Sequence, residues 1–166
     1  MMIKKLSTLV AYVSVFILLS LVMDYWRGRA LPDNHIPYDA YIDISGKSVD
    51  IKTLSDNGLT VVYFWATWCG PCKVTSPSVK YLAKHYPVVS IALKSGEGDA
   101  LTQYFNNSES VIPIVNDTDG VISKQWGVHA VPTVLFIKDK KILAYTMGAS
   151  GYPGLLARAW LAQVFH

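Results

Sequence analysis

The sequence predicts an α/β fold in which one domain of alternating strands and helices is preceded by one transmembrane helix. Three observations support this class. Short runs rich in Val, Ile and aromatic residues alternate with longer segments of helical periodicity. One such run, residues 61–65, leads directly into a Cys-x-x-Cys motif and then a helix-like segment. Near the N-terminus, residues 6–23 are 18 consecutive uncharged and mostly apolar residues, just enough to cross a bilayer.

The apolar N-terminal segment is interpreted as a transmembrane signal anchor over residues 6–23, with residues 1–5 in the cytoplasm. Lys4 and Lys5 precede it, and positive charge marks the cytoplasmic side of a span. Arg27 and Arg29 on the far side weaken this asymmetry. Two alternatives stay open: a cleaved signal peptide, although no small-x-small cleavage site ends the run, and a core helix.

The rest of the chain divides into a linker over residues 24–37 and one domain over residues 38–166. The net charge is +3, but the first 30 residues hold four of the 15 Lys/Arg and one of the 12 Asp/Glu, so the remainder carries 11 of each. A neutral domain gives no sign of nucleic-acid binding. If the anchor has the orientation inferred above, this domain faces the bacterial periplasm or an equivalent oxidising space.

The domain is expected to begin with a β-hairpin, because residues 41–44 and 48–51 alternate around a turn at 45–47. The motif is flanked by a buried strand over 61–65 and a helix over 73–86. The later elements follow from the same patterns: a turn at 56–58, a strand at 88–93, a helix capped by Asp99 and running to about 106, an extended segment at 111–115, a turn at 116–120, a brief helix at 123–126, a hairpin of 133–137 with 142–147, and a closing amphipathic helix over 153–165.

Cys69 and Cys72, the only cysteines of the chain, lie between the buried strand and the helix. Such a pair can form and reopen a redox disulfide, and partial positive charge at a helix N-terminus stabilises a thiolate. Cys69 is the candidate nucleophile and Cys72 the resolving thiol. The alternative is a metal site: two thiols could bind Cu(I), whereas a structural zinc site needs two more ligands, for which His85 and His129 are the candidates.

The segment Phe64–Lys73 resembles the active-site segment of thioredoxins, and above all the membrane-tethered periplasmic proteins of the TlpA/DsbE type. Pro77 matches the helix-kinking proline of that family, and Val131-Pro132-Thr133 matches its cis-proline loop. The resemblance covers roughly residues 36–165, and at subfamily level it extends to the suppressor-of-copper-sensitivity protein D group. It implies a thioredoxin-like fold with an N-terminal β-hairpin and a central insertion.

The resemblance also implies roles for individual residues. Pro132 would be the catalytic-site cis-proline. Trp68, Gly70, Pro71 and Val131 would contact substrate. Gly70-Pro71 is the dipeptide of the reductant thioredoxin, so it favours a reducing protein.

One departure from the family concerns the position six residues before the first cysteine. Thioredoxin has a buried aspartate there, and this sequence has Tyr63, expected to be a core residue. Proton transfer would then use water, or a residue such as Glu97 or Lys94.

The resulting hypothesis is a membrane-anchored protein disulfide oxidoreductase, predominantly monomeric, that requires no cofactor and no metal. By resemblance, its electron donor would be a DsbD-like transmembrane thiol reductant, and its substrate a disulfide-containing periplasmic protein, in a pathway of copper tolerance. Three alternatives stay open: a thiol reductant of cytochrome c maturation, a Cu(I)-binding module that uses the same cysteines, and a tethered adaptor. Against the first, Thr133 stands where those proteins carry an acidic residue, and Ala130 replaces a glycine.

Overall fold

A computed structural model describes residues 12, 15, 36–37, 40–96, 101–103 and 112–164. The chain divides into two compact units, Met1–Leu31 and Pro32–His166, and the second contains all the elements discussed below. None of the helices in the described part is both long and apolar enough to cross a membrane. The predicted anchor over 6–23 lies outside the described residues, apart from Tyr12 and Val15, which are helical.

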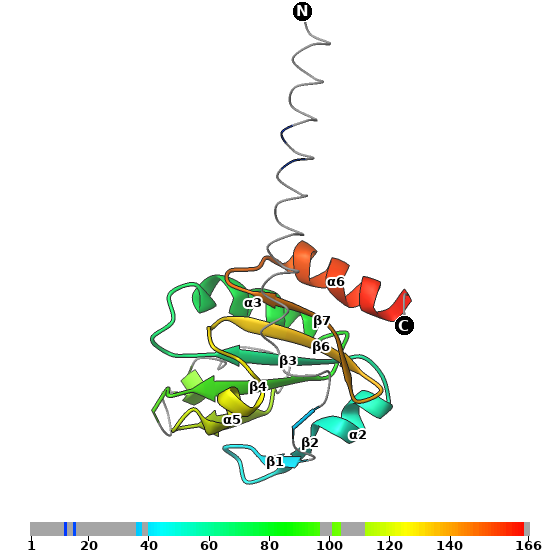
Figure 1. Cartoon of the computed structure of the whole chain (residues 1–166). Helices are drawn as coiled ribbons and strands as arrows, with labels where there is room; N and C mark the ends of the chain where they lie inside the picture. The colour runs from blue at the N-terminus through cyan, green and yellow to red at the C-terminus, as the bar shows by residue number, and fades with distance from the viewer. Residues whose placement is uncertain are drawn as a thin grey trace, which may run out of the picture. The chain divides into compact units, whose positions relative to one another are not determined.

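The domain is built on a five-stranded sheet with the strand order β5-β4-β3-β6-β7 (Figure 1). The three strands β3, β4 and β5 are parallel to one another, whereas β6 and β7 are antiparallel to their neighbours. The α/β class and the thioredoxin-like arrangement are therefore confirmed. The strand bounds are β3 Thr60–Trp65, β4 Val88–Leu93, β5 Ile114–Asp117, β6 Thr133–Lys138 and β7 Lys141–Met147.

A separate two-stranded sheet, β1 (Ala40–Ile42) with β2 (Ser48–Asp50), forms the predicted N-terminal hairpin. The hairpin is tied to the main domain by two contacts. Trp126 Nε1 donates a hydrogen bond of 2.7 Å to the Tyr41 hydroxyl, and Ile44 N–H donates to the Ile114 carbonyl at 2.8 Å. Trp126 also packs edge-on against Phe64, with ring centroids 5.8 Å apart. The hairpin thus helps to cover one face of the main sheet.

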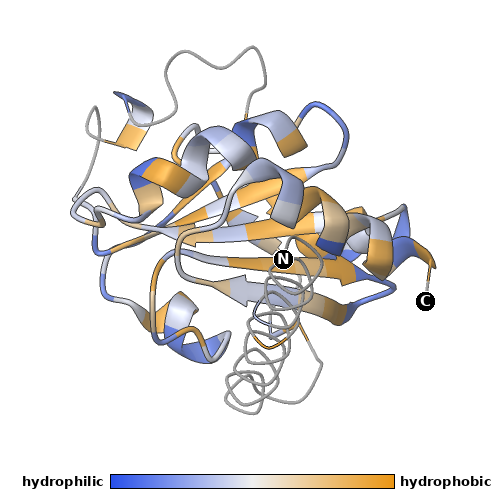
Figure 2. Cartoon of the chain, turned by 90° about the horizontal axis from the view of Figure 1, so that it is seen from above, coloured by the Kyte–Doolittle hydropathy of each residue, from blue (hydrophilic) through white to orange (hydrophobic). Residues whose placement is uncertain are grey.

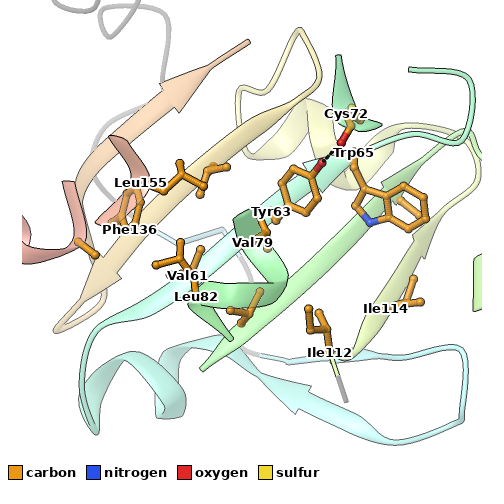
Figure 3. Close-up of a cluster of buried hydrophobic side chains, with 14 of the residues drawn as sticks. Val61, Tyr63, Trp65, Cys72, Val79, Leu82, Ile112, Ile114, Phe136 and Leu155 are labelled. Carbon is orange, nitrogen blue, oxygen red and sulfur yellow. Dashed lines mark hydrogen bonds between the residues drawn. The ribbon is translucent and has the colours of Figure 1, made fainter. Parts of the chain in front are cut away.

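Two helices, α3 (Cys72–Leu82) and α6 (Tyr152–Val164), lie together on the other face of the sheet, and Figure 2 shows this helical layer from outside. All six residues of β3 are buried, as expected for a strand covered on both faces. Alternate residues of β3 therefore enter different cores. Val61, Tyr63 and Trp65 pack in the cluster beneath α3 and α6, shown in Figure 3, together with Val79, Leu82, Phe136, Leu155 and Ala159.

Several predicted boundaries differ from the structure. Residues 51–56, expected to end the hairpin and begin a turn, form the helix α2 (Ile51–Asp56), because the Asp50 side chain caps it by accepting a hydrogen bond from Thr53 N–H. The motif helix ends at Leu82 and not at 86, since the chain closes in turns after Ala83. The strand expected at 111–115 begins at Ile114 and extends to Asp117, and the short helix α5 is Val121–Gln125.

The closing helix has the predicted extent within one residue, but its predicted amphipathic character is wrong. Leu155, Ala159 and Ala162 are buried, yet large apolar side chains also occupy its exposed side. For the helix expected after Asp99, residues 101–103 are helical, while Asp99 itself and residues 104–111 lie outside the described residues.

Candidate active site

The two cysteines lie where the C-terminal end of β3 passes into α3, and they form a disulfide with an S–S distance of 2.09 Å. Cys72 is the first residue of α3 and is fully buried, whereas Cys69 precedes the helix and is 4% exposed. Cys69 is thus the more accessible of the two cysteines, which agrees with its choice as the candidate nucleophile. This asymmetry suits a pair in which the outer sulfur meets the substrate and the inner one resolves the intermediate.

The electrostatic environment of Cys69 comes from the start of α3. The backbone N–H of Cys72 lies 3.1 Å from Cys69 Sγ and donates a hydrogen bond to it. No side chain caps this helix, whose N-cap residue is Pro71. The next two N–H groups, those of Lys73 and Val74, donate to the carbonyls of Gly70 and Pro71, so the Cys72 N–H is the direct donor to the sulfur and the helix dipole adds partial positive charge. When the disulfide is reduced, both effects favour a thiolate at Cys69 over one at Cys72.

A second loop at this end of the sheet contains the peptide bond Val131–Pro132, which is cis, as the resemblance implied. The antiparallel register pairs Phe64 with Thr133 and so brings Pro132 to the end of β3 from which the cysteine loop departs. A third loop joins them. Gly148 N–H donates to the Pro132 carbonyl at 2.8 Å, and Ser150 N–H donates to Thr75 Oγ1 at 3.1 Å. Val131 is half-buried, and Ala130 beside it is exposed.

Trp68 projects its side chain into solvent next to Cys69 and is 64% exposed. The ring is held in place, because its Nε1 donates a hydrogen bond of 3.0 Å to the Lys94 carbonyl at the end of β4. The adjacent Thr67 N–H donates to Ser95 Oγ at 3.0 Å. Gly70 and Pro71 are exposed beside it. The exposed site surface thus includes an indole ring whose orientation is fixed from a neighbouring strand.

Tyr63, at the position where thioredoxin has its aspartate, is fully buried and confirmed as a core residue. Its hydroxyl lies 2.9 Å from Ser76 Oγ, and Ser76 Oγ donates to the Cys72 carbonyl at 2.8 Å. Figure 3 shows the ring of Tyr63 pointing towards Cys72, with the longer 3.5 Å bond to the Cys72 carbonyl dashed. A pair of buried hydroxyls therefore lies behind the resolving cysteine.

Sequence reasoning missed three of these partners. Ser76 could have been found, because a buried tyrosine hydroxyl needs a partner and Ser76 lies one helical turn after Cys72. The contacts made by the Lys94 carbonyl and by Ser95 had no signal, since they join segments 26 and 28 residues apart.

Other predicted candidates are placed as follows. His85 and His129 are both exposed, and no group of three or more His, Cys, Asp or Glu that could hold a metal ion gathers among the described residues. The side chain of Lys94 lies against Gly120, at the start of α5. Glu97, the other residue named for proton transfer beside Lys94, lies outside the described residues.

Comparison with known proteins places this site among thiol-exchange proteins. Residues 28–146 match the model of the AhpC/TSA family. A thioredoxin-like protein of Haemophilus influenzae is 33% identical over 151 residues, which cover 90% of each chain. The thiol-disulfide oxidoreductase ResA of Bacillus thuringiensis subsp. konkukian is 32% identical over 111 residues, which cover 64% of each chain.

A solved structure has the same fold. It is a secreted disulfide oxidoreductase of Mycobacterium tuberculosis, described as homologous to DsbE of E. coli. It matches with a TM-score of 0.63 and 24% sequence identity, over 73% of this chain and 93% of that one.

Proposed function

The chain belongs to the AhpC/TSA family and is a thiol-disulfide oxidoreductase of the DsbE/ResA type, and we propose that it works as a membrane-tethered reductant in the bacterial periplasm. The observation that carries the activity is the disulfide between Cys69 and Cys72 at the first turn of α3. The tether, the direction of electron flow and the compartment are parts of the proposal. They are supported by the apolar segment 6–23, by the Gly70-Pro71 dipeptide and by the relatives.

The proposed reaction begins with the reduced pair. The Cys69 thiolate attacks one sulfur of a substrate disulfide, which breaks the substrate S–S bond and forms a mixed disulfide. The other substrate sulfur leaves as a thiolate and takes up a proton. Cys72 then loses its proton and attacks Cys69 Sγ, which releases the second substrate sulfur as a thiol. Two electrons and two protons have moved to the substrate, and the Cys69–Cys72 disulfide has formed.

The site supports each step with a distinct element. The N–H of Cys72 stabilises negative charge on Cys69 Sγ during attack and during release of the mixed disulfide. Trp68 and Val131 border the cysteine loop and the cis-proline loop, and in the proposal they dock the polypeptide around the substrate disulfide. The Tyr63 and Ser76 hydroxyls lie on the buried side of Cys72, where the resolving thiol must lose its proton.

The cysteine pair of a periplasmic reductant must be reduced again after each reaction by a dedicated donor, because its surroundings are oxidising. We assign this step to a transmembrane thiol reductant of the DsbD kind, whose dithiol would reduce Cys69–Cys72 and become a disulfide itself. The substrate would be a disulfide-containing periplasmic protein, and the resemblance to the copper-sensitivity group suggests a role in copper tolerance. The oxidoreductase functions as a monomer in this proposal.

The reduction potential of the full chain in detergent micelles, measured against a glutathione or dithiothreitol buffer, tests the direction of electron flow. A value near that of thioredoxin, roughly −270 mV, is expected for a reductant. A value near roughly −120 mV, which is typical of a dedicated oxidase, would reverse the proposal. A Cu(I) titration of the reduced chain provides the second test. Tight binding of one Cu(I) with no reduction of a protein disulfide would instead favour the metal-binding module.

A further inference from the structure

Thr75 places a fully buried hydroxyl between two distant segments of the chain. It lies on α3, three residues after Cys72. Its Oγ1 donates a hydrogen bond to the Pro71 carbonyl at 3.5 Å and accepts one from the N–H of Ser150 at 3.1 Å. An apolar side chain of the same size would fill this space without either bond. The hydroxyl therefore does more than pack, because it fixes the backbone of Ser150 to the first turn of α3.

The segment that Thr75 holds is the turn between β7 and α6. Gly148 N–H in this turn donates to the Pro132 carbonyl at 2.8 Å. Ser150 Oγ donates to the Gly148 carbonyl at 3.3 Å and lies 3.1 Å from Thr146 Oγ1. Since the one hydrogen on Ser150 Oγ is used, Thr146 is the donor between the two hydroxyls. Residues 146–150 thus form one closed turn, in which a displacement of Ser150 is passed on to Gly148.

This closed turn spans the two halves of the site. Pro132 lies at the start of β6, and the cysteine loop leaves the neighbouring strand β3 at the same end of the sheet. Both segments leave the hydrogen-bonded ladder there, so the ladder no longer sets the distance between them. The contacts from Thr75 through residues 146–150 to Pro132 connect the two halves beyond the sheet. A polypeptide that docks around its own disulfide meets both halves, whereas a small disulfide needs only Cys69.

We propose that Thr75 is a positioning residue, whose hydroxyl sets the distance between the cysteine pair and the cis-proline loop and thereby the affinity for polypeptide disulfides. The inference rests on the proposed function, since it concerns docking at the same site. Without the hydroxyl, the N–H of half-buried Ser150 can turn to water and the turn gains further positions. Only a fraction of the molecules then holds both loops at the docking distance, and the apparent affinity falls by that fraction.

Ser55 provides a matched control at the opposite end of the sheet. It is also fully buried on a helix, α2, and its Oγ donates to the Lys52 carbonyl at 2.8 Å. The same oxygen accepts a hydrogen bond of 3.2 Å from Lys140 N–H, in the turn between β6 and β7. Thr75 and Ser55 therefore hold the turns at the two ends of β7. Removal of the Ser55 hydroxyl loosens a comparable turn that lies away from the cysteines.

The test uses the full chain in detergent micelles, with its cysteine pair reduced beforehand. The parent protein, Thr75→Val, Thr75→Ser and Ser55→Ala are each mixed with an excess of scrambled ribonuclease in a single turnover. The closed pair is quantified after alkylation of the free thiols. The dependence on ribonuclease concentration separates the half-saturating concentration from the limiting rate constant. Hydroxyethyl disulfide serves as a second substrate that has no polypeptide to dock.

We expect Thr75→Val to raise the half-saturating concentration of ribonuclease roughly fivefold, the effect of about one hydrogen bond. The limiting rate constant and the rate with hydroxyethyl disulfide should change less than about twofold, because the chemistry at Cys69 is unaltered. Thr75→Ser should restore the parent value, and Ser55→Ala should keep it. An unchanged half-saturating concentration in Thr75→Val would overturn the proposal. An equal rise in Ser55→Ala would do so too, since it would indicate a general loss of rigidity. If Thr75→Val does not fold, Thr75→Ala and Thr75→Ser differ only in the hydroxyl and give the same comparison.

Amide hydrogen exchange tests the coupling without any substrate. In Thr75→Val, the Gly148 N–H that donates to the Pro132 carbonyl should exchange severalfold faster than in the parent protein, while the Lys140 N–H should not. Exchange of Gly148 at the parent rate would overturn the proposal. A parent protein that reduces hydroxyethyl disulfide but not ribonuclease would contradict the proposed function instead, and the exchange of Gly148 would still decide whether Thr75 positions the cis-proline loop.

Discussion

The hydroxyl oxygens of Tyr63 and Ser76 lie 2.9 Å apart in the core, on the strand and the helix that meet at the cysteine pair. Ser76 also donates to the carbonyl of Cys72, so the one hydrogen on Ser76 Oγ is used and Tyr63 is the donor between the two side chains. The pair thereby links β3 to the first turn of α3. Its position behind Cys72 makes it part of the support of the resolving cysteine.

Replacing Tyr63 with phenylalanine removes this donor and keeps the ring. We expect Tyr63→Phe to lower the free energy of unfolding by about 1 kcal/mol, the usual net contribution of one buried hydrogen bond. Ser76→Ala should cost a similar amount, and the double variant less than the sum, because the two share an interaction. Urea unfolding measures all three. Tyr81→Phe, on the exposed side of α3, is the control and should change stability by less than about 0.5 kcal/mol.

The order of attack within the cysteine pair can be tested by removing one thiol at a time. Cys72→Ser leaves Cys69 able to attack but removes the resolving thiol, so a mixed disulfide with a protein substrate should accumulate. Cys69→Ser should accumulate none, because Cys72 is fully buried. Non-reducing electrophoresis with scrambled ribonuclease as substrate provides the measurement. Accumulation with Cys69→Ser in place of Cys72→Ser would reverse the assigned roles.

The fixed indole of Trp68 should matter for protein substrates and not for small ones. Trp68→Ala removes an exposed ring that is anchored through the Lys94 carbonyl, and we expect roughly a tenfold loss in kcat/KM for a protein disulfide. Reduction of a small aromatic disulfide should be almost unchanged, because it does not need a docking surface. Trp68→Phe keeps a ring but loses the anchoring bond, so its kcat/KM for the protein disulfide should lie between those of the parent protein and of Trp68→Ala. Equal losses for both substrates would show that Trp68 acts on the chemistry of Cys69 and not on docking.

Much of the fold could be predicted because its signals are local. The strand over residues 88–93 and the β6–β7 hairpin follow from β-branched runs and from a turn of charged residues, and both have the expected positions. The helix α2 was missed because its first residue, Ile51, continues the alternating pattern of the hairpin. The cap that starts it, from Asp50 to Thr53, was nevertheless visible as an aspartate three residues before a threonine.

The parts of the site that could not be predicted depend on tertiary contacts. The cysteines were found from their motif, and the proline of the cis peptide bond was expected from the family resemblance. The contact between Trp68 and the Lys94 carbonyl joins the loop after β3 to the residue after β4 and leaves no sequence pattern. The outer face of α6 was mispredicted for a related reason. A helix with apolar residues all round does not reveal from its sequence which side the rest of the domain leaves exposed.

The cap of α2 predicts a specific dependence of stability on pH. Asp50 accepts hydrogen bonds from Thr53 Oγ1 at 2.7 Å and from Thr53 N–H at 2.9 Å, and these bonds hold the pKa of its carboxyl below the ordinary value of 3.8. A group whose pKa is lower in the folded state stabilises the protein fully above its unfolded pKa. That contribution is lost as the pH falls through the lower, folded value.

Asp50→Asn should therefore be less thermally stable than the parent protein near neutral pH, and the difference in Tm between the two should shrink as the pH falls below about 4. Differential scanning calorimetry across this range measures it. Thr53→Val is the matched control, because it removes the hydroxyl donor and leaves the carboxylate and the backbone N–H in place. Asp50 keeps only one of its two bonds in Thr53→Val. The Tm difference caused by Asp50→Asn should therefore depend less on pH in the Thr53→Val background than in the parent protein. A Tm difference between parent and Asp50→Asn that stays constant with pH would show that the ionised cap does not stabilise α2.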